Sequence, residues 1–490
     1  MSAERFVLCA LLLLPHPLHA QALEPVRELV TPFQDPLATT PEELDAGVAL
    51  PGDSRPVGCP MVRDSFSFGP LALAEAVDLA LCNNAQIKAT WAEIKLQAAN
   101  AGVARSAYLP TLSGSISRRE DTTRYPGSSI TTQRITNTPI NSVFSWRLLD
   151  FGTRGANHDA AMLALAAALA SHHAMLQQTL ATVVQDYFNA QVALAVWQAK
   201  ESNEKIAGNT LEAAKRRETK GAGTSSDTLQ AATALARATL EKNRAQGAYR
   251  KAMSVLFYGL GMGPQTDLAL ASDLDEPSGQ AARNLEEWIG EVKKSHPAIV
   301  AARAQLESAR HRVTATRAEG LPSLDVTAGY YDNGRLEQSS IAMHSRETVF
   351  GITLSFPLFE GFSRTYKVRA SEAQVERLAA ELYDTEHRIV MEVVKAHADA
   401  VSALHNLDAS AKLLTAAQEA LQASQRKYEK GAADILELLN TQAAFADARQ
   451  ERIRGLAEWR AARLRLLACA GAISRADLTP AETAAPASGK

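Results

Sequence analysis

The chain has 490 residues and a formal net charge of −3, with 51 Lys and Arg against 54 Asp and Glu. This near-neutral balance gives no electrostatic case for a nucleic-acid partner, which needs a basic face or stripe. Hydrophobic residues make up 46% of the sequence and aromatic residues only 6%. Such an apolar share is mostly Ala, Leu and Val, which favours long, closely packed helices over a large compact core.

The N-terminus has the pattern of a secretory signal peptide over residues 1–22. Arg5 precedes an apolar run from Phe6 to Leu14, and Ala20-Gln21-Ala22 supplies a small-x-small cleavage site. This run is too short to span a bilayer, and the best later candidate, Ala160–Ala170, is also short. We therefore expect an exported chain without a helical membrane anchor.

Residues 23–69 are rich in proline and polar side chains, and we expect them to form an N-terminal periplasmic extension. Three cysteines remain after export. Cys59 and Cys82 are close enough in sequence to pair in an oxidising compartment, which leaves Cys469 over. A metal site is the alternative, but no His or second Cys lies nearby at ligand spacing. We favour the disulfide.

The rest of the chain contains an internal repeat of about 210 residues. The segment from Leu73 to Ser117 aligns without a gap with the segment from Leu285 to Gly329, and Lys220-Gly221-Ala222 matches Lys430-Gly431-Ala432. A repeat with one internal order indicates two copies of one structural unit. The units are residues 70–283 and 284–472, followed by a polar tail, 473–490, that we expect to be disordered.

Each unit is expected to begin with a helix of about ten turns. These helices would cover Leu71–Ala107 and Leu285–Glu319, and they end before Pro110 and Pro322 because the residue before a proline is pushed out of the helical region.

A β-hairpin follows each first helix, at residues 108–151 and 322–358. In the second hairpin four apolar residues alternate with small or polar ones: Phe350, Ile352, Leu354 and Phe356. Alternation over about ten residues is typical of a barrel strand with a lipid face and a lumen face. We assign these four residues to a membrane-facing strand. A half-buried hairpin of a soluble protein is the alternative that this pattern leaves open.

A very long helix follows each hairpin, and each would measure about 100 Å at ~1.5 Å per residue. Both have heptad spacing with small residues at the seam, which is typical of coiled-coil packing. Each helix ends in a glycine turn, KGAGTSSD or KGAADILE, and the chain then returns as a helix, with Ser226 or Asp227 as the expected first N-cap. The long and return helices are expected at Thr153–Thr219, Phe362–Glu429, Asp227–Phe257 and Asp434–Ala468.

Each sequence motif that could suggest an enzyme has a simpler structural explanation. The GLGMG segment at residues 259–263 follows a helix instead of a strand and is better explained as a helix C-terminus. His172-His173 lies on a helix without an evident ligand partner, so seam or surface histidines are more plausible than a metal site. We expect no catalytic activity, no cofactor and no metal.

Four amphipathic strands cannot close a barrel, since the smallest such barrels need about eight. Open strand edges in a bilayer leave backbone groups unpaired at a cost of several kcal/mol each, so other copies of the chain must complete the sheet. A purely structural exported coiled coil would leave the duplicated strands unexplained. A porin would leave the long helices unexplained.

The sequence resembles the TolC family of outer-membrane channel-tunnel proteins over about residues 70 to 472. The matching segments are the duplicated LAEAVDLALCNN…ARSAYLPTL block, the FSWRLLDFGTR junction, and the turns KGAGTSSDTLQA and YEKGAADILELLNTQ. The resemblance implies an α+β homotrimer with a 12-stranded outer-membrane β-barrel in contact with lipid, continued by a periplasmic α-helical tunnel. It also implies docking on a periplasmic adaptor and an inner-membrane pump.

The resemblance assigns the periplasmic aperture to Asp227, Tyr428, Glu437 and Asn440. Asn440 replaces a carboxylate of the family's acidic ring, and Ala433 stands where the family's closing network has an arginine. Three copies of Glu437 around a narrow axis would favour cations. The sequence alone allows a solvated helical Glu equally, and the resemblance favours the ring. The adaptor-docking turns implied are those at Gly221, Gly223 and Gly431.

The segment before the repeat, with Cys59 and the ALCNN motif, makes the chain most similar to type I secretion components, including those that export toxins such as adenylate cyclase-haemolysin. The function implied is passive export of a large protein substrate, with an inner-membrane ABC transporter as the pump. The alternative is the outer-membrane component of a multidrug or small-molecule efflux pump.

Overall fold

A computed structural model describes residues 37, 70–127, 132–263, 269–271, 284–336, 345–471 and 473. The predicted signal peptide, Cys59, nearly all of the N-terminal extension and nearly all of the C-terminal tail lie outside the described residues. Cys82 is disulfide-bonded, whereas Cys469 is free. The pairing of Cys82 with Cys59 stays a prediction.

The described helices form two sets with identical lengths of 11, 22, 67 and 35 residues. The first set is α2 (Leu73–Asn83), α3 (Ala85–Ser106), α4 (Thr153–Thr219) and α5 (Ser225–Gly259). The second set is α6 (Leu285–Ser295), α7 (Pro297–Ala318), α8 (Ser363–Glu429) and α9 (Ile435–Cys469).

The expected first helices, Leu71–Ala107 and Leu285–Glu319, are wrong as single helices, because each is broken in two. Asn84 and His296 adopt extended backbone angles, with ψ of 126° and 124°. His296 precedes Pro297, which disfavours the helical region, and each residue caps the helix that follows it. The Asn84 Oδ1 accepts from Gln86 N at 2.8 Å, and the His296 Nδ1 accepts from Ala298 N at 3.2 Å.

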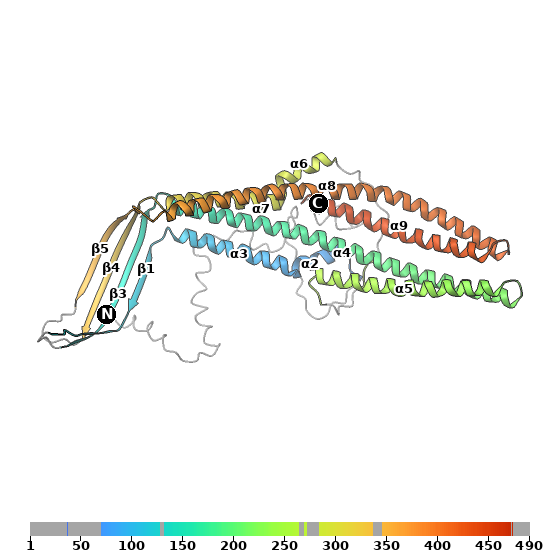
Figure 1. Ribbon diagram of the computed structural model, residues 1–490, viewed down its shortest axis with the longest axis horizontal. Coiled ribbons are helices and arrows are strands. Elements are labelled where there is room, and N and C mark those ends of the chain that lie inside the picture. Colours follow the sequence, from blue (N-terminus) through green and yellow to red (C-terminus); the bar gives the residue numbers. More distant parts are fainter. Residues whose placement is uncertain are drawn as a thin grey trace, which may run out of the picture.

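The strands form one antiparallel sheet at one end of the molecule, and the helices run away from it as a long layer (Figure 1). The order is β1-β3-β4-β5, and β2 continues along the same edge of β3 after a short break. The strands are β1 (Thr111–Ile116), β2 (Arg119–Thr123), β3 (Gln133–Leu149), β4 (Ser323–Leu336) and β5 (Arg346–Ser355).

Helix α4 runs through the middle of the helical layer. It packs against α3 and α7 near the sheet, and against α5 and α9 farther away, whereas α8 packs against α6, α7 and α9 and touches α4 near its C-terminal end (Figure 1). Five of the seven predicted heptad positions of α4 are at most 2% exposed, namely Leu176, Leu180, Val183, Tyr187 and Ala190. The other two, Leu194 and Trp197, are half-buried. Contrary to expectation, α4 includes an 18-residue stretch that is apolar enough to cross a membrane by length and composition.

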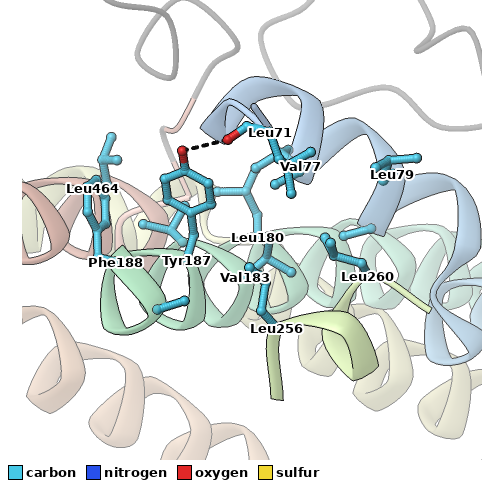
Figure 2. Close-up of a cluster of buried hydrophobic side chains, with 14 of the residues drawn as sticks. Leu71, Val77, Leu79, Leu180, Val183, Tyr187, Phe188, Leu256, Leu260 and Leu464 are labelled. Atoms are coloured by element: carbon cyan, nitrogen blue, oxygen red, sulfur yellow. Dashed lines mark hydrogen bonds between the residues drawn. The ribbon is translucent and has the colours of Figure 1, made fainter. Parts of the chain in front are cut away.

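The largest apolar core lies midway along the helices and joins α2, α4, α5 and α9 (Figure 2). Leu180, Leu256 and Leu260 are at most 1% exposed there. The Tyr187 hydroxyl donates to the Leu71 carbonyl at 3.0 Å, so its one polar atom is satisfied inside the core. The chain segment before α2 is thereby attached to the middle of α4.

Two sequence features that resembled sites have structural explanations. The GLGMG segment ends α5: Gly261 has φ +69°, and an added Cβ would lie 2.8 Å from the Asn83 carbonyl oxygen, so glycine is required. His172 is buried, and its Nδ1 lies 2.8 Å from the Thr90 hydroxyl. Burial lowers the pKa of His172 to about 4, so it is a neutral core histidine.

Candidate functional site

The sheet has one apolar face. Residues directly opposite one another in an antiparallel pair point to the same side, and the register aligns Trp146 with Val326 and Val326 with Ile352. The same register places further apolar residues on this side: Leu112, Ile116, Ile140, Phe144, Leu324, Ala328, Phe350 and Leu354. Phe350 is 72% exposed and Ile352 is 63% exposed. A contiguous exposed apolar face of this kind marks a surface that meets lipid or protein.

Three of the four residues predicted to face the membrane, Phe350, Ile352 and Leu354, lie on this face. The fourth, Phe356, directly follows the last residue of β5 and is exposed. Their contact with lipid stays a prediction.

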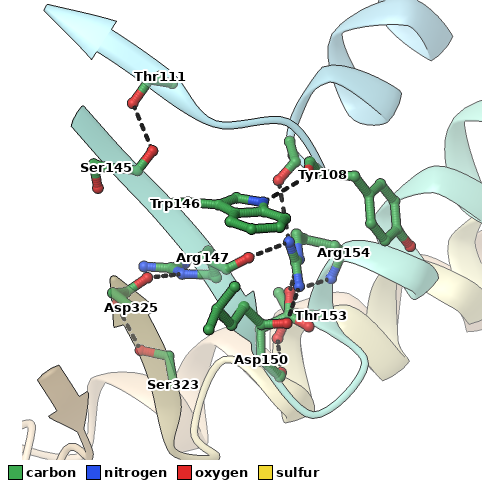
Figure 3. A network of polar contacts seen from close by, with 12 residues as sticks. Tyr108, Thr111, Ser145, Trp146, Arg147, Asp150, Thr153, Arg154, Ser323 and Asp325 are labelled. Carbon is green, nitrogen blue, oxygen red and sulfur yellow. Dashed lines mark hydrogen bonds and ion pairs between the residues drawn. The ribbon is translucent and has the colours of Figure 1, made fainter. Parts of the chain in front are cut away.

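The other face of the sheet is polar. Arg147 on β3 and its direct partner Asp325 on β4 form an ion pair, with 2.8 Å between Nε and Oδ1 (Figure 3). The Ser323 hydroxyl donates to the same carboxylate at 3.3 Å. A sheet that is apolar on one side and polar on the other has the pattern expected of a barrel wall between lipid and water.

Arg154 holds the joint between strand β3 and helix α4 (Figure 3). Its guanidinium donates to the Arg147 carbonyl at 2.7 Å, the Leu148 carbonyl at 3.1 Å and the Asp150 carboxylate at 3.0 Å. It also lies over the Tyr108 ring, 4.9 Å from its centroid. One side chain therefore satisfies carbonyls at the end of a strand, where the ladder no longer supplies donors.

The second unit repeats this joint with different partners. Arg364 donates to Glu360 at 2.9 Å. Its guanidinium packs against Gly320, where an added Cβ would overlap it. Gly320 corresponds to Tyr108 of the first unit. The arginine therefore packs against a glycine in the second unit and against an aromatic ring in the first.

The far end of the helical layer is formed by two glycine turns. Gly221 and Gly431 have φ of +70° and +73°. Gly221 N donates to the Glu218 carbonyl at 2.9 Å, and Gly431 N donates to the Tyr428 carbonyl at 3.0 Å. Glycine is favoured at both positions because this left-handed backbone strains other residues.

The return helices begin with different caps. The N-cap of α5 is Thr224, whose hydroxyl accepts from Asp227 N at 3.2 Å. The prediction of Ser226 or Asp227 as the N-cap is therefore wrong. The Asp227 carboxylate in turn accepts from Thr224 N at 3.1 Å, which completes a capping box. Asp434 is the cap of α9 and accepts from Leu436 N at 2.9 Å.

The two tips are joined by Arg217 of α4, a residue that the sequence analysis missed. Its Nη1 donates to the Tyr428 carbonyl at 2.7 Å, and its guanidinium lies 4.6 Å from the centroid of the Tyr428 ring. Tyr428 is buried in a small apolar cluster with Ala231, Ile435 and Leu438. The only sequence signal was a basic residue four positions before each glycine, at Arg217 and Lys427.

The predicted aperture residues all lie near this tip but do not form one network. Within the described part of the chain no hydrogen bond joins Asp227 to Tyr428. Glu437 forms an ion pair with Lys427, with 3.3 Å between Nζ and Oε1. Asn440 is exposed one helical turn farther along α9. Their assignment to an aperture stays a prediction.

Solved structures share this architecture. Outer membrane protein VceC from Vibrio cholerae superposes with a TM-score of 0.69 at 20% identity, covering 81% of this chain and 96% of that one. The Neisseria gonorrhoeae MtrE outer membrane channel superposes with a TM-score of 0.69 at 20% identity, covering 82% and 88%. The chain thus has the same fold as these outer-membrane proteins.

Residues 76–261 and 288–472 match the family described as outer membrane efflux protein. Protein CyaE of Bordetella pertussis is 34% identical over 445 residues, 91% of this chain and 92% of that one. Outer membrane efflux protein BepC of Brucella suis is 24% identical (76% and 80% covered), and alkaline protease secretion protein AprF of Pseudomonas aeruginosa is 23% identical (62% and 63% covered). The chain belongs to the outer membrane efflux protein family, whose members include TolC.

Proposed function

We propose that three copies of this chain form a passive conduit of a type I secretion system. Their strands would close a 12-stranded barrel in the outer membrane, and their helices would form a periplasmic tunnel for a large protein substrate. The tunnel would dock on a periplasmic adaptor and an inner-membrane ABC transporter. The alternative is a small-molecule efflux pump, which would use the same architecture.

The observation that carries the proposal is the sheet of one chain, with its apolar face and two open edges. β1 and β5 each have a partner on one side only among the described strands. In a bilayer each unpaired backbone group on these edges would cost several kcal/mol. Pairing β5 of one copy with β1 of the next removes both edges and closes a ring.

Support for protein secretion comes from the relatives. CyaE covers nearly the whole chain, and AprF is by name a protease secretion protein. BepC is by name an efflux protein, and it keeps the alternative open. Adaptor docking is assigned to the turns at Gly221, Gly223 and Gly431, because they lie at the end farthest from the sheet (Figure 1).

The test compares culture-supernatant proteins from the parent strain and from a strain that lacks this gene. We expect one large secreted polypeptide to disappear and to accumulate inside the cell, and the wild-type gene to restore it. An unchanged supernatant, under conditions where the gene is expressed, would contradict protein secretion and support small-molecule efflux.

A matched pair of variants tests the membrane assignment of the sheet. Ile352→Lys places a charge on the apolar face, and Thr353→Lys places the same charge on the polar face. A lipid-facing Lys near the bilayer centre costs about 2–4 kcal/mol. We therefore expect Ile352→Lys to reduce the trimer recovered from outer membranes and Thr353→Lys to leave it nearly unchanged. Equal recovery would contradict the assignment.

A further inference from the structure

Helices α7 and α9 lie end to end between α4 and α8 (Figure 1), and a cavity lies at their junction. The two helix ends touch there, because a Cβ added to Gly471 would lie 3.3 Å from the Pro297 Cδ. The cavity has a volume of about 520 Å³, and sites for small molecules usually measure roughly 300–1,000 Å³. All four helices belong to one chain, so the walls of the cavity need no partner copy.

The α4 wall of the cavity is polar. Its residues include three glutamines, Gln177, Gln178 and Gln185. Gln177 is only 3% exposed, and neither its amide nitrogen nor its amide oxygen has a hydrogen-bond partner in the described part of the chain. Buried amides are nearly always paired, because an unpaired donor or acceptor costs free energy. This wall therefore contains a buried amide that lacks a partner.

The cavity also has an unpaired anion and an unpaired cation on two different helices. Asp186 of α4 is half-buried and forms no hydrogen bond or ion pair with a described residue, and burial raises its pKa. Arg465 of α9 lies at the exposed rim beside the Cys469 thiol and pairs with no described carboxylate. Arg388 and Glu392 of α8 also line the cavity, but they neutralise one another, with 3.3 Å between Nη1 and Oε1.

The internal repeat shows that the helical fold does not require the two unpaired charges. Helices α4 and α8 have equal length, as do α5 and α9, so positions in the two units can be compared directly. The counterpart of Asp186 is Ala396, and the counterpart of Arg465 is Val255. Because the same helices form without either charge, the pair calls for an explanation other than folding.

We propose that this cavity binds a short peptide with free termini, whose ammonium group pairs with Asp186, whose carboxylate pairs with Arg465 and whose amide pairs with Gln177. An ammonium group offers three donors to a carboxylate, and a guanidinium binds a carboxylate through two parallel hydrogen bonds. The cavity also has apolar walls, among them Ala181 and Ile389, which suit small apolar side chains. The site lies within one chain and does not depend on the trimeric conduit proposed above.

The free thiol of Cys469 supplies a native reporter, because it lines the cavity and Cys82 is disulfide-bonded. Burial is the main cause that raises the pKa of Cys469, so the thiol reacts slowly with an uncharged reagent such as N-ethylmaleimide. The test measures the alkylation rate of Cys469 in the purified full-length protein by mass spectrometry. We expect alanyl-alanine at millimolar concentration to slow this rate severalfold and in a saturable manner.

Two related molecules test which groups of the peptide are recognised. N-acetyl-alanyl-alanine amide has the same side chains without either terminal charge, and free alanine has both charges without the peptide amide. We expect both to protect the thiol less well than alanyl-alanine does. Equal protection by the capped dipeptide, equal protection by free alanine, or no protection by any of the three would overturn the proposal.

Asp186→Asn and Arg465→Gln each remove one of the two charges, and we expect each to weaken the binding of alanyl-alanine about tenfold. Isothermal titration calorimetry measures this affinity without relying on the thiol. The matched controls are Glu212→Gln on α4 and Arg454→Gln on α9, because both side chains are exposed and lie outside the cavity.

We expect both control variants to bind like the wild type. Wild-type affinity in both cavity variants would overturn the assignment of the two termini. The comparison of the three small molecules uses the wild-type protein, so it holds however the variants fold. Neither experiment depends on secretion, so a failure here is distinct from a failure of the proposed function.

Discussion

Helices α4 and α8 have the same length and the same place in the repeat, yet they are buried very differently. Of their 67 residues each, α4 buries 21 and α8 buries nine. The difference follows from position, because α4 is covered on both sides by helices of its own chain and α8 forms an edge (Figure 1). One structural unit can thus serve as core or as boundary.

The edge helix keeps apolar side chains at its surface. Exposed apolar residues on α8 are Tyr366, Tyr383, Met391, Val394, Leu404 and Leu413. A neighbouring copy would cover such a face in the proposed trimer. Equivalent positions in the two units therefore allow the same substitution to be tested in two environments.

The largest difference is expected at the two strand-to-helix joints. Arg154 and Asp150 are only 13% and 10% exposed at their side chains, whereas Arg364 and Glu360 are 30% and 43% exposed. Removing one member of a largely buried, multiply bonded pair costs about 3 kcal/mol, and removing an exposed one costs at most about 1 kcal/mol.

We therefore expect Arg154→Ala to lower the urea midpoint of unfolding far more than Arg364→Ala. Equal midpoints would show that the two joints contribute equally despite their different burial.

The broken first helices give a comparison that depends on pH. Burial is the main cause that lowers the pKa of His296 to about 4, and the charge of Arg388 adds to it. The unfolded chain has a histidine pKa near ~6.5 and so binds more protons between these values. The contribution of neutral His296 to the free energy of unfolding is therefore fully present above about pH 6.5. It is lost as the pH falls to about 4, and the loss is at most about 3 kcal/mol.

The first unit supplies the control for this prediction, because Asn84 caps α3 where His296 caps α7. His296→Asn retains a capping side chain and removes the titrating group. We expect unfolding midpoints of this variant to fall less between pH 6.5 and pH 4 than those of the wild type. An unchanged pH dependence would assign the effect to other groups, including the buried His172.

Much of the helical framework followed from the sequence. The long helix α4 begins at the predicted Thr153 and ends at Thr219, near which its end was predicted, and α8 differs only at Phe362, which adopts a left-handed conformation before the helix. Heptad spacing and the absence of proline carried these predictions. The break at His296 could have been read from Pro297, but the matching break at Asn84 has no proline and depends on side-chain capping.

The contacts at the sheet and at the helical tips were harder to predict from the sequence. The apolar strand face follows from alternation, but Arg217 could not be assigned, because its partner Tyr428 is 211 positions away in the chain. A basic residue near a helix C-terminus is expected for the helix dipole alone. The packing of α4 against α9 and the contact of Arg217 with Tyr428 show that this arginine crosses to the other tip.

A third comparison tests core against edge directly. Val184 of α4 is 1% exposed, and its counterpart Val394 of α8 is 38% exposed. Truncating the buried Val184 side chain loses the transfer free energy of its methyl groups and leaves a small cavity, which together cost about 1–2 kcal/mol of stability. Substitutions of surface residues usually change the stability by less than about 0.5 kcal/mol. We expect Val184→Ala to lower the unfolding midpoint and Val394→Ala to leave it nearly unchanged in dissociated protein. The opposite order would contradict the central place of α4.

The smallest effects are expected at the third residue of each return helix, Asp227 in α5 and Glu437 in α9. Asp227 completes a capping box, so Asp227→Ala should cost about 1 kcal/mol of stability. Asp434 caps α9, and Glu437 forms an ion pair with the exposed Lys427. In the proposed aperture the Glu437 carboxylate would attract cations at the tip, and the charge of Lys427 would partly offset it.

Glu437→Ala should accordingly shift the reversal potential under a salt gradient towards weaker cation preference and reduce block by divalent ions, and Lys427→Ala should shift it the other way. Asp227→Ala should leave the reversal potential unchanged, because its carboxylate is already engaged by the backbone of its own helix. If Glu437→Ala leaves ion selectivity unchanged, Glu437 lies outside the constriction, and its pair with Lys427 is only a surface contact.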